Sequence, residues 1–149
     1  MRSRFNRFVH RPPRVMLLFF EGCVSLAMTR LGLLFLPLRT VRACLRRFTR
    51  IAGTVNRRPA SAAEIIWAVS AAERYSPVGS TCLAVALLGQ ALLQRHGYDS
   101  RMRIGVRRDD QGKFHAHAWL EQEGKIVIGG PLSVIQNYTT LPEMEHLIA

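Results

Sequence analysis

The hydrophobic pattern of residues 15–38 predicts one long helix. The stretch is apolar for longer than the roughly 20 residues that a membrane span needs, yet it contains Glu21 and Arg30, which argue against a simple span. A polar stripe runs along it at four-residue steps, through Glu21, Ser25 and Thr29. We therefore expect a helix that packs on the rest of the protein or on a partner.

Two more helices are predicted before the middle of the chain. Pro37 is expected to end or kink the first helix, and residues 38–51 resume as a basic amphipathic helix that suits a membrane surface or a partner. Residues 53–59 have the composition of a linker. Ser61 and Glu64 then form a capping-box pattern, which predicts the start of another helix.

The segment 79–97 (GSTCLAVALLGQALLQRHG) predicts a buried helix with clear ends. Ser80 is expected to be its N-cap, and Gly97 follows two cationic residues as a C-terminal stop. Its first turns have no polar face, so other elements must enclose them. Cys82 lies at the start of this enclosed helix.

From Arg101 the apolar period changes to two, which predicts strands over residues 101–107, 114–121 and 126–128. Turns at 109–112 and 123–124 separate them. In the second strand one face carries Phe114, Ala116, Ala118 and Leu120, and the other carries His115, His117, Trp119 and Glu121. The pattern predicts an α+β fold, with N-terminal helices followed by a Cys-bearing helix packed on a small antiparallel sheet.

The positive charge belongs to the N-terminal part. Residues 1–58 hold thirteen Arg and one Glu, a net +12, whereas residues 59–149 hold eight Lys or Arg and nine Asp or Glu, a net −1. We therefore divide the chain into a basic helical segment, 1–58, and a core, 59–149. The basic segment fits an acidic partner, an anionic membrane or a solubilising flank, but it lacks the interleaved aromatic residues and motifs of nucleic-acid binding.

The three cysteines, Cys23, Cys44 and Cys82, are widely spaced and form no C-x-x-C pair. This excludes a disulfide framework and favours a cytoplasmic protein. The apolar N-terminal stretch also lacks a clean signal-peptide cleavage site. No nucleotide-binding glycine motif occurs, so we expect no cofactor.

A cysteine in the first turn of a helix lies where free N–H groups and the helix dipole favour a thiolate. Free cysteine is also a common buried residue, so Cys82 is either a nucleophile or part of the core. A nearby base favours the first alternative, and His115 or His117 can supply it from the neighbouring strand. The H-x-H pair lacks further ligands at metal spacing, so we expect no metal site.

The combination STCL-x-x-AL-x-x-Q-x-LL-x-x-x-G, R-I-G-V-R and F-H-A-H-A-W-L-E resembles the leader peptidases of lasso-peptide biosynthesis, which have a transglutaminase-like, papain-related cysteine protease core. The resemblance covers residues 61–130. It implies an endopeptidase that cuts one amide bond of a precursor peptide and frees the core amine for an ATP-dependent lasso cyclase. Cys82 would be the nucleophile and His117 the base, with His115, Trp119 and Asn137 as auxiliary candidates.

The third catalytic residue departs from the family pattern. Family members commonly carry an acid about a dozen positions after the catalytic His, where this chain reads KIVIGG. Pairing outward from the 123–124 turn places Trp119 opposite Ile128, and His117 opposite Gly130 with Gly129 beside it. A backbone carbonyl, Asn137 or another tail residue could replace the acid, or the enzyme could work as a dyad.

No leader-recognition domain is visible, so the chain resembles the split form of the family, which acts with a separate recognition protein. Its basic helices would dock that protein, the cyclase or a membrane surface. Two rival functions remain: a non-catalytic scaffold of the same fold, and a transglutaminase-like enzyme that transfers the acyl group to an amine.

Overall fold

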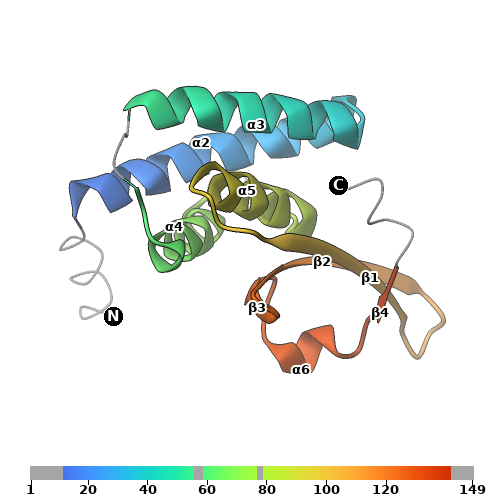
Figure 1. Ribbon diagram of the computed structural model, residues 1–149. Helices are drawn as coiled ribbons and strands as arrows, with labels where there is room; N and C mark the ends of the chain where they lie inside the picture. Colours follow the sequence, from blue (N-terminus) through green and yellow to red (C-terminus); the bar gives the residue numbers. More distant parts are fainter. Residues whose placement is uncertain (1–11, 56–58, 77–78, 142–149) are drawn as a thin grey trace.

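The computed structural model describes residues 12–55, 59–76 and 79–141 of the chain. Four long helices precede a small sheet (Figure 1). The elements are α2 Pro13–Phe35, α3 Leu38–Val55, α4 Ala62–Tyr75, α5 Cys82–Arg95, β1 Arg101–Arg108, β2 Phe114–Gln122, β3 Lys125–Ile128, α6 Leu132–Ile135 and β4 Thr139–Thr140. The α+β prediction is confirmed.

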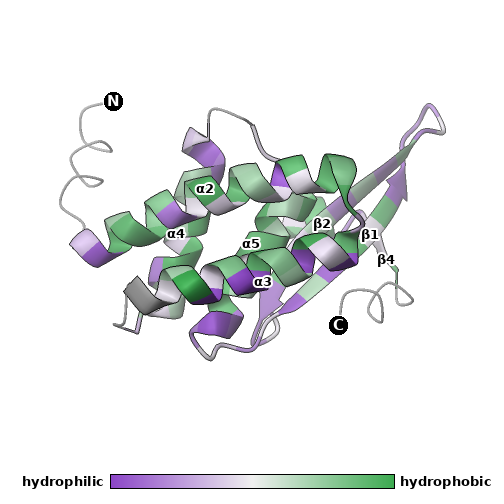
Figure 2. Ribbon diagram, turned by 90° about the horizontal axis from the view of Figure 1, so that it is seen from above, coloured by the Kyte–Doolittle hydropathy of each residue, from purple (hydrophilic) through white to green (hydrophobic). Residues whose placement is uncertain are grey.

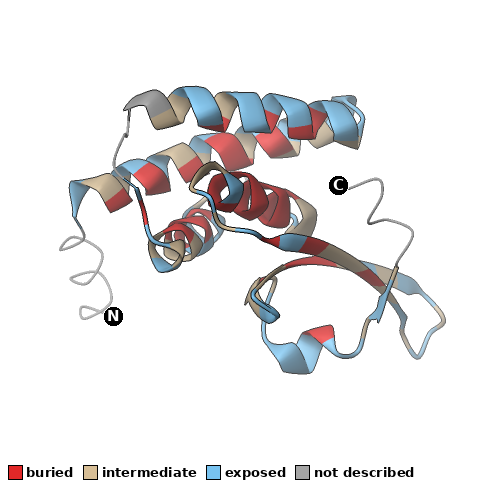
Figure 3. Cartoon of the chain, in the orientation of Figure 1, coloured by how far each residue is buried: buried red, intermediate tan, exposed pale blue. Residues whose placement is uncertain are grey.

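The elements form stacked layers. α2 and α3 lie side by side as an outer layer over α4 and α5, and the sheet lies beneath α5 (Figures 1 and 2). The buried residues gather between these layers, as Figure 3 shows. One hydrophobic cluster joins Leu18 of α2 and Leu45 of α3 to α4, α5 and the sheet. The outer helices therefore share the core of the sheet-bearing part, while the predicted division at residue 58 stays a prediction.

The helix boundaries follow local chemistry. Pro37 separates α2 from α3, as predicted, because it supplies no N–H to continue the first helix. At α4 the capping box is complete: the Ser61 hydroxyl accepts the Glu64 N–H at 3.3 Å, and the Glu64 carboxylate accepts the Ser61 N–H at 2.9 Å. These bonds satisfy two donors that a helix start otherwise leaves free.

The ends of α5 were predicted within one residue. The N-cap is Thr81, not Ser80, because the Thr81 hydroxyl accepts the Ala84 N–H at 3.3 Å. At the other end Gly97 adopts a φ of 82°, and the Tyr98 N–H reaches the carbonyl of the last turn. A left-handed glycine in this position is the usual C-terminal stop.

The sheet has the order β3-β2-β1-β4, and all pairs are antiparallel. The three predicted strands are confirmed, and α6 and β4 are additions from a segment with weak sequence signals. The predicted pairing of Trp119 with Ile128 is wrong, because a bulge between Leu120 and Glu121 moves Leu120 opposite Ile128. A bulge places one extra residue on one strand and shifts the register beyond it.

A buried ion pair joins three helices. Glu21 of α2 binds the Arg95 guanidinium of α5, and both side chains are 9% exposed. Arg95 also donates to the Thr49 carbonyl of α3 at 2.6 Å. The polar stripe predicted along the first helix thus faces the core. The charge of Glu21 in this apolar helix is explained by its pairing with Arg95.

Removing one partner of this pair should strongly destabilise the fold. Glu21→Leu leaves the Arg95 charge buried without its carboxylate, so we expect a loss of about 3–5 kcal/mol in the free energy of unfolding, measured by urea denaturation. The double variant Glu21→Leu/Arg95→Met should recover part of this loss. Arg14→Met, which breaks the more exposed pair with Glu64, is the control and should cost at most about 1 kcal/mol. Equal losses at both pairs would contradict the prediction.

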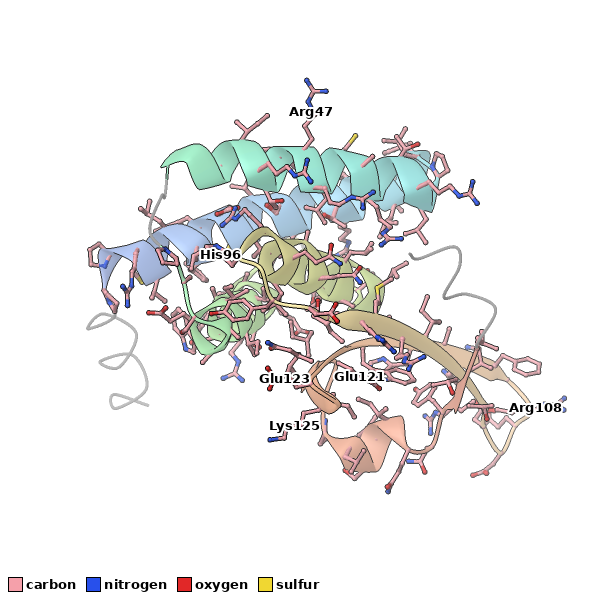
Figure 4. The ribbon with its side chains drawn as sticks, in the orientation of Figure 1. Arg47, His96, Arg108, Glu121, Glu123 and Lys125 are labelled. Atoms are coloured by element: carbon pink, nitrogen blue, oxygen red, sulfur yellow. The ribbon has the colours of Figure 1, made fainter. Side chains whose placement is uncertain are left out.

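His96 lies beside this pair at the end of α5 (Figure 4). Its Nδ1 accepts the Ala60 N–H at 3.3 Å, and the Arg95 guanidinium lies 3.1 Å from its Nε2. Burial, followed by the charge of Arg95, lowers the pKa of His96 below its ordinary value. The folded protein therefore favours the neutral imidazole.

Stability should consequently fall as the solution becomes acidic. Below about pH 6.5 the unfolded chain binds a proton at His96 that the folded chain resists, so acid shifts the equilibrium toward unfolding. We expect the melting temperature to drop between about pH 7.5 and about pH 5.5, and to drop less in His96→Gln, which keeps an acceptor for Ala60 but does not titrate. An identical drop in both proteins would show that His96 is not responsible.

Candidate functional site

Cys82 is the first residue of α5. The hydroxyl of the N-cap Thr81 accepts the N–H of Ala84, two residues after Cys82. The Cys82 thiol is free, half-buried and packed against the hydrophobic cluster. Its position at a helix start is thus as predicted, and the apolar residues of α5 hold that helix start in place.

α5 packs on one particular face of β2. Ala118 and Leu120 belong to the cluster that α5 forms with the sheet. Gly89 allows the close approach, since a side chain there would lie 2.5 Å from Ile128 and 3.1 Å from Leu120. The alternating residues of β2, among them His117, therefore lie on the other face.

His117 is held by a backbone carbonyl. Its Nε2 lies 2.6 Å from the oxygen of Gly129. A carbonyl oxygen only accepts hydrogen bonds, so Nε2 must carry the proton. In the neutral imidazole this leaves the lone pair on Nδ1, and Nδ1 is the atom that can act as a base.

Two aromatic rings flank the His117 imidazole. Trp119 stacks with it at a centroid distance of 6.3 Å, and Tyr138 lies tilted at 5.3 Å. Trp119 is 2% exposed, and its Nε1 donates to Glu121 at 3.0 Å. Trp119 therefore flanks the imidazole, as predicted. Tyr138 was not foreseen, because it comes from the tail segment with weak signals.

Gly129 lies a dozen positions after His117, where the leader peptidases that the sequence resembles commonly carry an acid. Its φ is 112°, a value that favours glycine. A Cβ at this residue would lie 2.5 Å from the Trp119 Cβ and 2.8 Å from its Cα. Because glycine has no Cβ, the backbone at Gly129 can approach β2 closely. Its carbonyl oxygen supplies the hydrogen-bond acceptor that a carboxylate would otherwise provide. Of the alternatives left open by the sequence, the geometry matches the backbone carbonyl.

The other predicted auxiliary residues have different partners. His115 lies 2.7 Å from Asp109 at the β1–β2 turn, and this bond, with further bonds from backbone N–H groups, lowers the pKa of Asp109. Asn137 is exposed, and its amide donates to the Ser133 carbonyl at 2.9 Å. The structure therefore does not place either side chain in a hydrogen bond with His117.

Cys82 and His117 themselves are not in hydrogen-bond contact. Across residues 12–55, 59–76 and 79–141, no hydrogen bond joins the Cys82 Sγ to the imidazole, and α5 covers the opposite face of β2. Catalytic hydrogen bonds are often long or poorly aligned in the unliganded state of an enzyme. The two residues lie on packed elements, but the structure does not assemble them as a dyad.

Arg30 is a further charged residue near the start of α5. A Cβ on Gly79 would lie 2.6 Å from its Nη1, so the guanidinium rests against the loop that precedes Cys82. From the sequence, Arg30 served only as a charge that argues against a membrane span. No local pattern links a residue of α2 to a loop about 50 positions later, so the contact was not predictable.

Metal ligands do not gather at this site. Among the described residues, no three side chains of His, Cys, Asp or Glu come close enough to hold a metal ion. The chemistry available here is that of a thiol, an imidazole and backbone donors.

Comparison with models of protein families identifies the superfamily of the chain. A model of the transglutaminase-like superfamily matches residues 24–143, from the middle of α2 to beyond β4. The chain therefore belongs to the transglutaminase-like superfamily, which includes cysteine proteases and transglutaminases. Comparisons with curated proteins and with solved structures gave no match.

The tight fit of Gly129 leads to a testable difference between two neighbouring glycines. Gly129→Ala should lower the melting temperature clearly more than Gly130→Ala. Both residues have a positive φ, but a Cβ at Gly130 meets nothing within 4 Å. Scanning calorimetry of the two variants measures the difference. A larger loss in Gly130→Ala would show that backbone strain, not the contact with Trp119, decides the effect.

Proposed function

We propose that the protein is a cysteine endopeptidase that removes the leader from a lasso-peptide precursor. The observation that carries the proposal is the bond between His117 Nε2 and the Gly129 carbonyl, 2.6 Å long. This bond fixes the tautomer that leaves Nδ1 free to act as a base. The carbonyl comes from the position where the leader peptidases that the sequence resembles commonly carry an acid. Cys82 at the start of α5 supplies the nucleophile.

The proposed reaction begins with the thiol. Nδ1 of His117 takes the Cys82 proton, and Sγ attacks the carbonyl carbon at the leader–core junction. The electron pair of the C=O bond moves to the oxygen, where the Cys82 N–H at the helix start stabilises it. The C–N bond then breaks, the imidazolium returns the proton to the leaving amine, and the core peptide departs.

Water completes the cycle. His117 takes a proton from a water molecule, whose oxygen attacks the carbonyl carbon of the thioester. The C–S bond then breaks, the imidazolium returns its proton to the Cys82 sulfur, and the leader leaves as a carboxylic acid that loses its proton to the solvent. Approach of Sγ to Nδ1 belongs to the substrate complex, because the two groups are not in contact in the unliganded chain. Trp119 and Tyr138 would keep bulk water from the imidazole.

The proposed partners follow from the resemblance to the leader peptidases of lasso-peptide biosynthesis. We propose a separate leader-recognition protein that presents the precursor, and an ATP-dependent lasso cyclase that consumes the freed core amine. The three free cysteines fit a reducing cytoplasm.

One observation favours a second candidate, a non-catalytic scaffold. The separation of Cys82 from His117 is what a structural member of the superfamily would show. In that case Cys82 is a core residue, and Gly129 only closes the packing around Trp119. Reactivity of the thiol distinguishes the two candidates.

Replacing either proposed catalytic residue should abolish leader removal. We expect Cys82→Ala and His117→Ala to lose at least about a thousandfold in cleavage rate, because nucleophile and base act as one unit. Cys44→Ala, which removes an exposed cysteine of α3, is the matched control and should cleave normally. The assay incubates the precursor with the protein and its recognition partner and follows the products by mass spectrometry.

The products also separate the rival functions. A cleaved leader supports the peptidase, a crosslinked precursor indicates acyl transfer to an amine, and normal cleavage by Cys82→Ala would refute the proposal. Iodoacetamide near pH 6 provides a second readout without substrate. Selective labelling of Cys82 over Cys44 is expected of the enzyme, and inertness of Cys82 is expected of a scaffold.

A further inference from the structure

The outer face of α2 carries an uncovered apolar stripe. Its six large side chains are 49–83% exposed and recur every three or four residues, so they lie on one side of the helix over about 27 Å. They are Leu17, Phe20, Val24, Met28, Leu31 and Phe35. The opposite side of α2 faces the core. Contiguous exposed apolar surface of this kind marks an interaction site.

α3 adds positive charge to the solvent-exposed side of the outer layer. Arg39, Arg46, Arg47 and Arg50 are exposed and share the side of α3 that faces away from the core. Figure 4 shows Arg47 pointing outward from this layer. The only acid between residues 12 and 55 is Glu21, and it is buried against Arg95. The outer face of these helices is therefore apolar and basic, with no negative charge.

An apolar groove connects the two helices. It has a volume of about 200 Å³ and lies along their junction, and it belongs to the same surface. Its lining residues include Met28 and Gly32 of α2 and Cys44 and Phe48 of α3. Apolar contact area thus continues from Met28 of the stripe onto α3.

We propose that the α2–α3 face docks on the surface of an anionic lipid bilayer. The stripe would enter the boundary between headgroups and acyl chains, and the α3 arginines would contact lipid phosphates. A long row of aliphatic and aromatic side chains on α2, with exposed arginines on the adjoining α3, matches this occupant, since the face offers few polar groups that would select a particular protein.

α2 lies on the membrane and does not span it. The helix is long and apolar enough to cross a bilayer, but 33% of its most apolar window is buried inside the protein. Spanning would expose Glu21 to lipid and break its pair with Arg95. The sheet lies on the far side of α5 from this face (Figure 1), so docking leaves His117 turned toward the solvent side.

Sedimentation of the full chain with vesicles tests the proposal. We expect binding to phosphatidylcholine vesicles that contain about 30% phosphatidylglycerol, and much weaker binding to pure phosphatidylcholine. Arg46→Gln/Arg47→Gln/Arg50→Gln should lower the affinity for the anionic vesicles on the order of a hundredfold. Phe20→Ser/Leu31→Ser should weaken it as well, because it removes apolar contact area.

Matched changes elsewhere should leave vesicle binding unchanged. Phe114→Ser alters an aromatic residue of the sheet that is 69% exposed, and Arg74→Gln/Arg101→Gln removes exposed charge outside the α2–α3 face. Circular dichroism confirms that each variant is folded. The assay needs no precursor peptide, so its outcome is independent of the proposed peptidase activity.

Three results would overturn the proposal. They are failure of the folded chain to bind anionic vesicles, binding that the α3 and α2 variants do not change, and loss of self-association in Phe20→Ser/Leu31→Ser with no vesicle binding. The last result would assign the face to a second copy of the chain. Sedimentation velocity without lipid measures that association.

Discussion

The ion pair between Glu21 and Arg95 is the interaction on which the arrangement of the helices depends. Charges buried to this extent are costly unless each finds a partner, and Arg95 finds two, the Glu21 carboxylate and the Thr49 carbonyl. These bonds fix the relative rotation of α2, α3 and α5. The orientation of α5 determines in turn where Cys82 lies against the sheet, so the candidate nucleophile is positioned from the opposite end of its own helix.

Most of the fold could be predicted from local patterns. Pro37, the Ser61–Glu64 capping box and Gly97 act through backbone chemistry within a few residues, so the helix boundaries beside them were found closely. The end of α3 has no such signal, and the helix continues to Val55, into the predicted linker 53–59. The period of two after Arg101 identified the three main strands. Tertiary packing could be predicted only in part. The polar stripe through Glu21 indicated a buried side of α2, but it did not indicate that Arg95 is the partner of Glu21.

The site was less predictable because its decisive contacts are not made by side chains at characteristic spacing. The bulge after Leu120 shifts the strand register by one residue, and nothing in the local pattern indicates it. Tyr138 reaches His117 from a segment without clear periodicity. The acceptor for His117 is a main-chain oxygen, which every residue possesses, so only the unusual Gly129-Gly130 pair hinted that the backbone comes close there.

The exchange of a carboxylate for a carbonyl changes the charge balance of the imidazole. A carboxylate carries a full negative charge and stabilises the protonated ring, whereas the Gly129 oxygen provides only the partial charge of a dipole. The orientation of the ring therefore depends on the path of the backbone at Gly129, because a main-chain oxygen moves only with its own peptide unit. Any change that shifts this stretch of backbone away from Trp119 would release the imidazole without altering a side chain of the site.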